Sequence, residues 1–501
     1  MMPDAFPKHI KEYMIPKVKK ELYYKCLGCS GVHSIDKLLY VCPECNEVLM
    51  IEDRKDKDLQ KISGRLWQQI FDYRKMLNIP ALKGIYRYHE FTGSCIPLES
   101  IVYLGEGNTP VVEANKNLQQ QTGLKFYYKN DGQNPSASFK DRGMASAISS
   151  IKYLIDKKLV SDVIAICAST GDTSAAAALY ASYLGHLIKS AVILPYKKVT
   201  SQQLSQPLGS GAQVFEIPGV FDDCMKIVEH LSDKYNVALL NSKNAWRILG
   251  QESYSYEIAQ DFEWDMKNKV VVVPIGNAGN ISAVMNGFIK FYNADIIDFL
   301  PKIIGVQSEH ADPVFQYYRN PDAGKRKFVP VDTKPSVAQA AMIGNPVSMP
   351  RVIKIVNKYN KLANCQNVFF VQVSEQSIMD WQLTANRNGH IACTQGGECL
   401  AGLKKAMQLN LINSQETAIL DATAHAIKFS EFQNLYFKSK IPEPYKINSD
   451  PDKINLPDLI MPDNPDIIPS QKKRLGKKEF QNFVQNISKK IAIKLNLEIS
   501  S

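Results

Sequence analysis

Segments of strand length alternate with helical stretches through the middle of the chain. Residues 163–167, 191–194, 213–216, 238–240 and 270–275 have the composition of strands, and amphipathic stretches separate most of them. Parallel strands need helical crossovers of this kind, and strands covered on both faces read as continuous apolar runs. The pattern therefore predicts an α/β fold with two open, parallel-rich sheets. Further strands are expected at residues 126–129, 303–306, 368–371 and 418–420.

One lysine stands where a helix is expected to begin. Asn134 and Pro135 are typical of a turn, and Ser138 is a candidate N-cap. Residues 144–154 have the apolar spacing of a helix, so Lys140 falls in its first turn. Free N–H groups and the positive dipole end disfavour a cation there and lower the pKa of the amine. A neutral amine attacks aldehydes, so Lys140 is a candidate Schiff-base lysine, and a solvated lysine in a charged Lys-Asp-Arg cluster is the alternative.

Two turns from strand to helix are rich in glycine, hydroxyl and amide residues. Residues 168–174 read Ala-Ser-Thr-Gly-Asp-Thr-Ser before an alanine-rich helix, and residues 276–280 read Gly-Asn-Ala-Gly-Asn before a helix expected at 281–291. Backbone N–H groups in such turns converge on an anion in front of the helix. The first loop alone is weak evidence, because many α/β proteins have such loops for packing. The glycine density of the second favours a phosphate site, although it matches neither a Walker loop nor GxGxxG.

A hydroxyl follows the last expected strand. Residues 421–425 read Asp-Ala-Thr-Ala-His, so Thr423 lies at the carboxyl end of a strand, where open α/β sheets bind ligands. A lone threonine at such a position is also commonly structural.

Four cysteines near the N-terminus form two CxxC pairs separated by twelve residues, with residues 40 and 41 expected as a strand into the second pair. Two tight turns that each present two thiolates suit a tetrahedral zinc ribbon. Such a site has no open position, so the predicted zinc is structural, and four reduced thiols without an ion are the alternative. The predicted ligands are Cys26, Cys29, Cys42 and Cys45.

Composition narrows the class of protein. The 501 residues are 45% hydrophobic and 22% charged, which is typical of a globular protein with two or three domains. The start of the chain carries acid and proline where a secretory signal needs a basic start, and no apolar run nears 18 residues. Ten cysteines are too dilute for a disulfide scaffold, so a cytoplasmic location is expected.

The net charge of +10 is concentrated at one end. Residues 471–501 hold eight Lys/Arg and two Glu, so the rest of the chain is nearly balanced. We therefore expect neither a nucleic-acid nor a membrane partner for the body. The predicted division is an N-terminal segment at 1–100 with the ribbon and a helix at 66–76, a core at 101–440 with a smaller α/β domain inserted at about 140–235, and a tail at 441–501.

The tail itself has two parts. Six prolines between Pro442 and Pro465 predict an extended strap. Farther on, apolar residues recur at spacings of three and four, which predicts a basic amphipathic helix. We expect this helix to dock on its own body or on a partner subunit, with membrane or nucleic-acid binding as the alternative. The apolar positions are Phe480, Phe483, Val484, Ile487 and Ile491.

Together these segments resemble the pyridoxal-phosphate enzymes of the tryptophan-synthase-β fold, also called fold type II, and within them the threonine synthase family. The resemblance covers residues 104–430, with the motifs in the family's order. The loop at 168–178 and the last motif are most similar to the plant-type branch, whereas the four-cysteine ribbon occurs in another branch. The motifs are SFKDRGM at 138–144, CASTGDTSAAAALYA at 167–181, NSKNAWRILGQ at 241–251, GNAGNI at 276–281 and TAHAIKF at 423–429.

The resemblance implies roles for individual residues. Lys140 would carry pyridoxal 5'-phosphate, and Thr423 would face the pyridine nitrogen. Asp172 stands where one branch has an asparagine beside the phenolic oxygen, and Ser136-Ala137 stands where the family often has Thr-Gly. The cofactor phosphate would lie in a cradle of Gly276, Asn277, Ala278, Gly279 and Asn280.

The implied activity is that of a threonine synthase, which converts O-phospho-L-homoserine and water to L-threonine and phosphate. Such a site must also hold the substrate phosphate, for which Arg247 is the best bidentate partner, unless it pairs with Glu252 on a helix surface. The other candidates are Ser169, Thr170, Thr173, Asn241 and Ser242. Family members are usually homodimers. The rival hypotheses are cysteate synthase acting on phosphoserine, a serine/threonine dehydratase, and a binding module built on the ribbon and tail with an inactive core.

Overall fold

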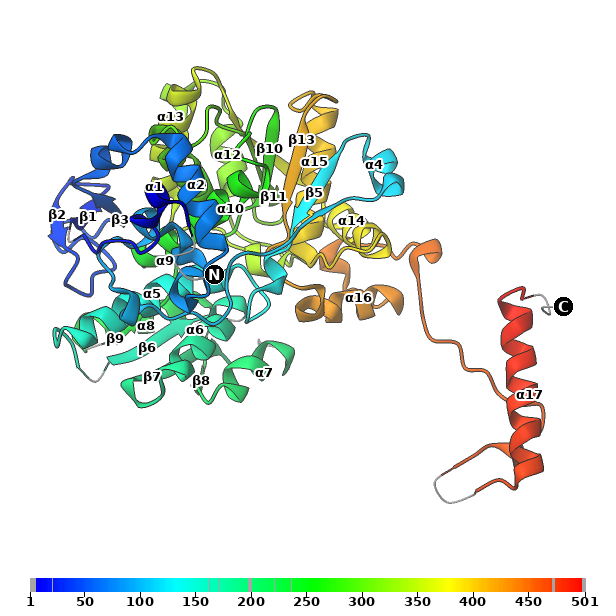
Figure 1. Ribbon diagram of the computed structural model, residues 1–501. Helices are drawn as coiled ribbons and strands as arrows, with labels where there is room; N and C mark the ends of the chain where they lie inside the picture. The colour runs from blue at the N-terminus through cyan, green and yellow to red at the C-terminus, as the bar shows by residue number, and fades with distance from the viewer. Residues whose placement is uncertain are drawn as a thin grey trace. The chain divides into compact units, whose positions relative to one another are not determined.

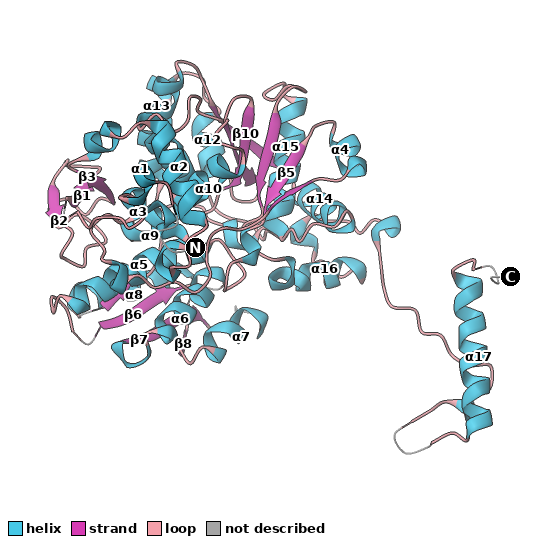
Figure 2. Cartoon of the chain, in the orientation of Figure 1, coloured by secondary structure: helices cyan, strands magenta, loops and turns pink. Residues whose placement is uncertain are grey.

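The protein is described by a computed structural model over residues 6–19, 21–161, 163–169, 171–196, 201–219, 221–235, 237–470 and 474–497. It divides into two units. The larger contains residues 1–434 with 441–448, and the smaller contains residues 435–440 with 449–501. Figure 1 shows the course of the chain and Figure 2 its secondary structure.

A six-stranded sheet forms the centre of the larger unit, in the order β12-β11-β10-β13-β5-β4. All neighbouring strands are parallel except the edge strand β4, which pairs antiparallel with β5. The bounds are β4 (Val111–Glu113), β5 (Phe126–Lys129), β10 (Lys269–Pro274), β11 (Lys302–Ser308), β12 (Val368–Val373) and β13 (Thr417–Asp421).

Helices cover both faces of this sheet. Val271 and Val273 of β10 lie in one hydrophobic cluster with side chains of α11 (Gly279–Asn293) and α13 (Met349–Ala363). The intervening residues of β10 face the opposite side, because side chains alternate along a strand, and there α15 (Thr394–Gln408) packs along β10 to β13. Cys399 of α15 contacts the carbonyl of Val272. Figure 1 shows α13 and α15 on opposite sides of the strands.

A second, smaller sheet is entirely parallel and has the order β8-β7-β6-β9. Its strands are β6 (Val163–Ala168), β7 (Ile188–Pro195), β8 (Gln213–Ile217) and β9 (Val237–Leu239). The helices that accompany both sheets are α4 (Lys116–Thr122), α5 (Lys140–Asp156), α6 (Asp172–Tyr183), α7 (Ser201–Gly209), α8 (Phe221–Lys234), α9 (Ala245–Gln251), α10 (Ser253–Asp261), α12 (Pro313–Tyr318), α14 (Glu375–Arg387) and α16 (Ser430–Phe437).

The N-terminal segment packs on this core. Its three short strands, β1 (Leu22–Cys26), β2 (Val32–Ser34) and β3 (Leu49–Asp53), form an antiparallel sheet in the order β2-β1-β3. We call residues 22–53 the cysteine ribbon. Helices α1 (Lys8–Lys11), α2 (Gly64–Lys75) and α3 (His89–Thr92) complete the segment, and α2 contributes Trp67, Ile70 and Phe71 to the core.

The α/β prediction and the nine strands expected from the sequence are confirmed. Two local predictions are wrong. Ser138 does not cap α5; it forms a β-bridge with Ala424, so the helix begins only at Lys140, with Phe139 at the N-cap. Residues 40 and 41 form no strand, because only Val41 pairs, in an isolated bridge with Val48.

The smaller unit contains α17 (Lys477–Lys494), which confirms the helix predicted in the tail. Lys490 bonds Met461 and pairs with Asp463, and Lys494 pairs with Asp458, so the preceding residues run beside the helix. Docking of this helix stays a prediction. None of the helices that the structure describes is both long and apolar enough to cross a membrane.

Candidate active site

A pocket lies where the carboxyl ends of strands from both sheets meet. The segments after β10 and β13 of the large sheet reach it, as do those after β6 and β9 of the small sheet. This is the edge at which open α/β sheets bind ligands. Its lining is Phe139, Lys140, Asp172, Ser242, Arg247, Ile248, Gln251, Pro274, Gly276, Asn277, Ala278, Gly279, Asn280, Ala340, Ala341, Gln395 and Thr423.

Lys140 is the first residue of α5, as the sequence predicts for the first turn. The amide of Phe139 donates to the carbonyl of Thr423 at 2.7 Å, which ties the start of the helix to the loop after β13. The Nζ atom lies 4.2 Å from the centre of the Phe139 ring, and it makes no hydrogen bond or ion pair with the described residues. Burial, and secondly the charge of Arg247, lower the pKa of the Lys140 amine to about 7. A large fraction of the amine is therefore neutral at neutral pH.

The Gly-Asn-Ala-Gly-Asn turn forms a nest at the N-terminus of α11. Ala278 takes a left-handed conformation with φ of 61°, and no side chain caps the helix. A Cβ on Gly276 would lie 2.9 Å from the Cα of Ala341, so only glycine fits there. The first N–H groups of α11 have no partner within the helix and point toward the pocket. Asn280 differs from the rest, because its side chain donates to Asp421 at 2.7 Å.

Two buried polar side chains in or beside the pocket have atoms without a hydrogen-bond partner among the described residues. Gln395 lies in the first turn of α15, and neither polar atom of its buried amide has a hydrogen-bond partner. One oxygen of Asp421 is also buried and unbonded, and burial raises the pKa of this carboxyl well above its usual range. Unpaired buried polar atoms cost free energy, so a ligand group that bonds to them would be favoured. Thr423 lies among these residues, with its hydroxyl 3.6 Å from the Cys393 sulfur.

Ser242 and Arg247 line the side of the pocket that follows β9. Arg247 is buried, donates from Nη1 to the carbonyl of Leu240 at 2.9 Å, and leaves its Nε without a partner. Burial lowers the pKa of its guanidinium to about 10. The alternative pairing with Glu252 is absent among these described residues, since that carboxylate bonds to Asn286 and Tyr256 and pairs with Lys290.

Not every predicted residue lines the pocket. Asn241 bonds both ways with the backbone of Ala168, at 3.0 and 2.7 Å, and so joins β6 to the segment after β9. The Ser169 hydroxyl accepts from the amide of Gly171. Thr170 lies outside the described residues, and Thr173 is in α6 but not in the described lining. A substrate role for these four stays a prediction.

Asp172 has a partner that the sequence analysis missed. Lys428 lies 3.0 Å from its carboxylate and donates to the carbonyl of Ser136 at 2.9 Å. Other residues that line the pocket without having been predicted include Ile248, Gln251, Ala340, Ala341 and Gln395. The first two belong to the quoted motif at 241–251 and were open to inference. The other three come from stretches that carry no distinctive pattern.

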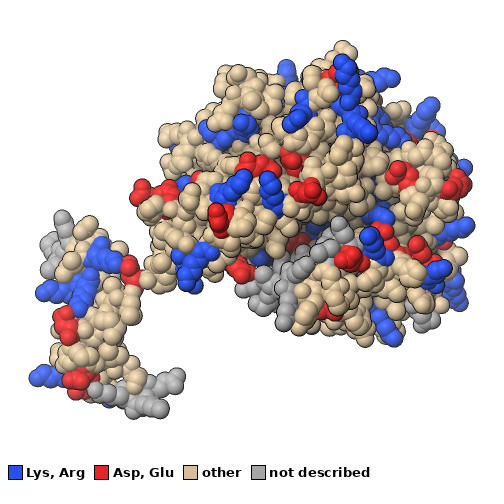
Figure 3. Space-filling view, turned by 180° about the vertical axis from the view of Figure 1, so that it is seen from behind, with Lys and Arg blue, Asp and Glu red and all other residues tan. Residues whose placement is uncertain are grey.

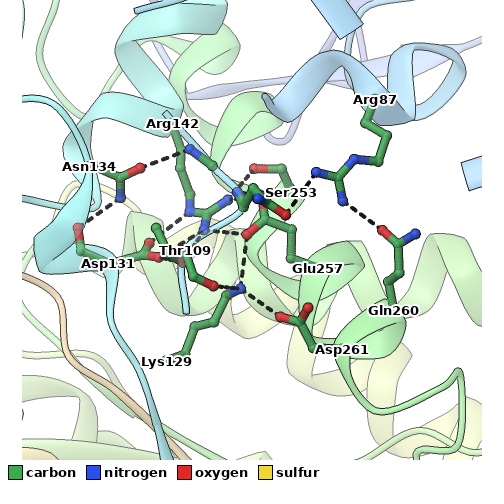
Figure 4. Close-up of polar contacts among 12 residues, drawn as sticks. Arg87, Thr109, Lys129, Asp131, Asn134, Arg142, Ser253, Glu257, Gln260 and Asp261 are labelled. Atoms are coloured by element: carbon green, nitrogen blue, oxygen red, sulfur yellow. Dashed lines mark hydrogen bonds and ion pairs between the residues drawn. The ribbon is translucent and has the colours of Figure 1, made fainter. Parts of the chain in front are cut away.

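A buried network of charges lies behind the lysine helix (Figure 4). Arg142 bonds to Asp131 through Nε at 2.7 Å and to Glu257 through both terminal nitrogens. Lys129 contacts Glu257 at 3.0 Å and Asp261 at 2.8 Å. Burial alone would raise the pKa of Glu257, but Arg142 and Lys129 hold it well below its usual range. This network joins β5, α5 and α10, and so it fixes the helix that carries Lys140.

The four ribbon cysteines are brought together as predicted. Their sulfur atoms all lie within 4.8 Å of one another, with Cys26 and Cys45 at 3.3 Å and Cys29 and Cys42 at 3.6 Å. Four thiols at such separations fit a tetrahedral zinc ion. His33, which the sequence analysis missed, lies 3.3 Å from the Cys42 sulfur.

The chain is similar to threonine synthases from distant organisms. That of Methanocaldococcus jannaschii is 33% identical over 409 residues, which cover 81% of this chain and 92% of that protein. Threonine synthase 2, chloroplastic, of Arabidopsis thaliana is 31% identical over 388 residues, 77% of this chain and 72% of that protein. The crystal structure of threonine synthase from Escherichia coli has the same fold, with a TM-score of 0.62 at 18% identity over 86% of this chain and 93% of that one. Residues 102–420 match the family described as pyridoxal-phosphate dependent enzyme, and the chain therefore belongs to that family.

Proposed function

We propose that the protein is a threonine synthase that converts O-phospho-L-homoserine and water to L-threonine and phosphate. The observation that carries this proposal is that one pocket contains an unpaired lysine and two separate groups of residues that suit an anion. The nest before α11 is one proposed anion site, and buried Arg247 with Ser242 is the other. A reaction on a phosphorylated amino acid with a phosphorylated cofactor needs both.

The residues present fit pyridoxal phosphate. The Lys140 amine, with its pKa of about 7, suits covalent attachment to an aldehyde, and the nest suits a phosphate monoester. Gln395 and Thr423 offer polar atoms to the ring. When bound, the cofactor supplies an electron sink that makes the protons on the substrate's α and β carbons removable.

The chain's own residues supply positioning and proton transfer. Arg247 and Ser242 would bind the substrate phosphate and hold the γ carbon–oxygen bond that breaks. Lys140, once released from the cofactor, would take the α proton and then a β proton. Phosphate leaves from the γ carbon with the electrons of the broken carbon–oxygen bond. One proton is then added at the γ carbon, which becomes the methyl group, the hydroxyl of water adds at the β carbon, and a proton returns to the α carbon; the remaining proton of the water goes to the released phosphate. Thr423 would face the ring nitrogen and, unlike a carboxylate, would not hold it protonated, which would moderate the electron sink and favour elimination and addition.

The test is to incubate purified protein with O-phospho-L-homoserine in ¹⁸O-labelled water. We expect threonine and phosphate in equal amounts, with the label in the threonine hydroxyl. O-Phospho-L-serine with sulfite, and unphosphorylated serine and threonine, are the parallel substrates. Cysteate from the first, or a keto acid from the second, with no threonine from phosphohomoserine, would establish one of the rival activities. The Lys140→Ala variant is the blank for all three.

We further propose a structural zinc ion held by Cys26, Cys29, Cys42 and Cys45, which is supported by the geometry of the four sulfurs. Metal analysis of untagged protein should find one zinc per chain, and Cys42→Ser should lose it and destabilise the N-terminal hundred residues. If the parent protein contains no zinc and Cys42→Ser is as stable as the parent, the ribbon is free of metal.

We also propose that the protein is a homodimer and that it is located in the cytoplasm. Ten cysteines, all present as thiols in the structure, support a reducing compartment. On the face drawn in Figure 3, acidic and basic side chains are interspersed over the larger unit, which supports a small-molecule enzyme over a nucleic-acid binder. Sedimentation of the pure protein tests the dimer.

A further inference from the structure

A buried arginine outside the pocket joins three segments of the larger unit. Arg351 lies in the first turn of α13, and its side chain is fully buried. Its Nε and Nη2 donate to the carbonyl of Leu49 at 3.2 and 2.7 Å. It also donates to the carbonyls of Ser242 at 2.9 Å and Lys243 at 3.0 Å, and to the hydroxyl of Ser348 at 2.8 Å.

All five N–H groups of this guanidinium are therefore used, and every acceptor is neutral. No carboxylate in the described part of the chain bonds to it, and burial lowers its pKa to about 10. Burying a cation without a counter-ion costs free energy. Because the guanidinium group is planar and rigid, it fixes the distances between the three backbone segments to which it donates.

Each of the three segments that Arg351 bonds belongs to or supports a different part of the molecule: the cysteine ribbon, the pocket lining or the nest. Leu49 opens strand β3 of the cysteine ribbon. Ser242 lines the pocket, and Arg247 follows it on α9. The amide of Ser348 donates to the carbonyl of Asn277, so the third segment supports the nest. The guanidinium thus connects the ribbon to both anion sites.

A second bond connects the ribbon to the same helix. The Trp246 indole donates to the Tyr24 hydroxyl at 3.0 Å, and Trp246 immediately precedes Arg247. Tyr24 and Leu49 of the ribbon lie in one hydrophobic cluster with Trp246 and Leu249 of α9. The ribbon therefore packs against α9, the helix that carries Arg247.

We propose that Arg351 is a positioning residue, through which the cysteine ribbon holds residues 242–247 in the geometry that binds the substrate phosphate. This inference rests on the proposed function. It assigns the ribbon a part in substrate affinity in addition to local stability. A separate backbone bond from the amide of Phe139, which precedes Lys140, to the carbonyl of Thr423 holds those two segments together, so the chemical step should change much less than substrate binding.

The test is Arg351→Lys in the holoenzyme, because lysine keeps the charge but loses the fork. We expect the KM for O-phospho-L-homoserine and the inhibition constant of inorganic phosphate to rise about tenfold, since misplacement of a binding group by about 1 Å is costly. The kcat and the cofactor absorbance should stay within about twofold. Tyr24→Phe, which removes the acceptor for Trp246 and the donor to the carbonyl of Lys37 inside the ribbon, should raise the same two constants by about two- to threefold.

Arg74→Lys is the matched control. Arg74 is also fully buried and also holds the N-terminal segment together, through the carbonyls of Tyr13, Met14 and Arg87 and the carboxylate of Glu90, and none of these described partners belongs to a pocket segment. It should lower stability and leave KM unchanged. Equal KM increases in both lysine variants, or unchanged KM and phosphate inhibition in Arg351→Lys, would overturn the proposal. If Arg351→Lys does not fold, an unchanged KM in Tyr24→Phe overturns it. Absence of threonine formation by the parent enzyme would instead refute the proposed function.

Discussion

Lys140 and Arg142 share one helical turn but belong to buried clusters of opposite kinds. Around Arg142 every charge has a partner. Its nitrogens make four contacts with Asp131 and Glu257, one with the Ser253 hydroxyl and one with the Thr109 hydroxyl, and Lys129 also pairs with Glu257. Around Lys140, the amine, the Nε of Arg247 and the amide of Gln395 all lack hydrogen-bond partners among the described residues. The first cluster holds the helix in place, and the second is complete only with a ligand.

This difference in hydrogen bonding distinguishes residues that hold the fold together from residues that bind a ligand. Buried polar atoms are nearly always bonded in native proteins, so a group of unbonded ones in a pocket indicates what the pocket binds. Burial alone does not make that distinction, because Arg142 and Arg247 are both buried. Breaking the first cluster should affect stability, and breaking the second should affect chemistry.

The largest expected effect follows from Lys140→Ala. We expect turnover to fall by about 10³-fold or more, because this residue is proposed to carry the cofactor and to move protons. Stability should hardly change, since the amine makes no polar contact that the structure describes. Steady-state kinetics and thermal unfolding measure the two effects. Lys152→Ala is the control and should retain activity, because this lysine lies on the same helix and, among the described residues, pairs only with Asp156.

Arg142→Met should give the opposite result in the paired cluster. It removes the cation that Asp131 and Glu257 share and leaves Glu257 with Lys129 but Asp131 buried without its ion pair, so the free energy of unfolding should fall by about 3–5 kcal/mol. Chemical denaturation of the purified variant measures this loss. A loss below about 1 kcal/mol would show that the network does not hold the helix.

Arg247→Ala tests another residue of the cluster that lacks hydrogen-bond partners. We expect kcat/KM for O-phospho-L-homoserine to fall by about 10- to 100-fold, the amount expected for hydrogen bonds to a charged group. The cofactor absorbance should persist, because the nest and not Arg247 is proposed to hold the cofactor phosphate. Lost absorbance with normal substrate affinity would mean that the two anion sites are exchanged.

The smallest effect concerns pH. Only the neutral amine attacks an aldehyde, and burial together with Arg247 lowers the pKa of Lys140 to about 7. The rate of covalent cofactor attachment to the apoprotein should therefore rise with pH and reach half its plateau near pH 7. Removing the neighbouring cation in Arg247→Ala should move this midpoint upward by up to about one unit. A midpoint near pH 10 in the parent protein would show that the amine is solvated.

The strands and the nest could be predicted because local sequence determines them. Continuous apolar runs such as Val270 to Val273 allow little except a buried parallel strand, and two glycines beside Ala278 specify a turn at a helix start. Lys140, the nest, Ser242, Arg247, Asp172 and Thr423 were all placed in one pocket as the motifs implied.

What could not be predicted depends on contacts between distant segments. Gln395 lines the pocket because of how α15 packs on the sheet, and Lys428 contacts Asp172 from the loop after β13. Asn241 does not face the pocket but bonds to the backbone of Ala168. In the part of the chain that the structure describes, Arg351 bonds only to backbone carbonyls and one hydroxyl, so no residue pattern indicates its role. Ser138 has the composition of a cap, but pairing with Ala424 overrides that preference.

The central claim is that the unpaired lysine is the attachment point of the cofactor. Borohydride reduction of the protein loaded with pyridoxal phosphate, followed by peptide mapping with mass spectrometry, tests it most directly. The account predicts a stable pyridoxyl-phosphate adduct on Lys140 and none on the paired lysines Lys129 and Lys428. An adduct on either of those residues, or no adduct on Lys140, would contradict it.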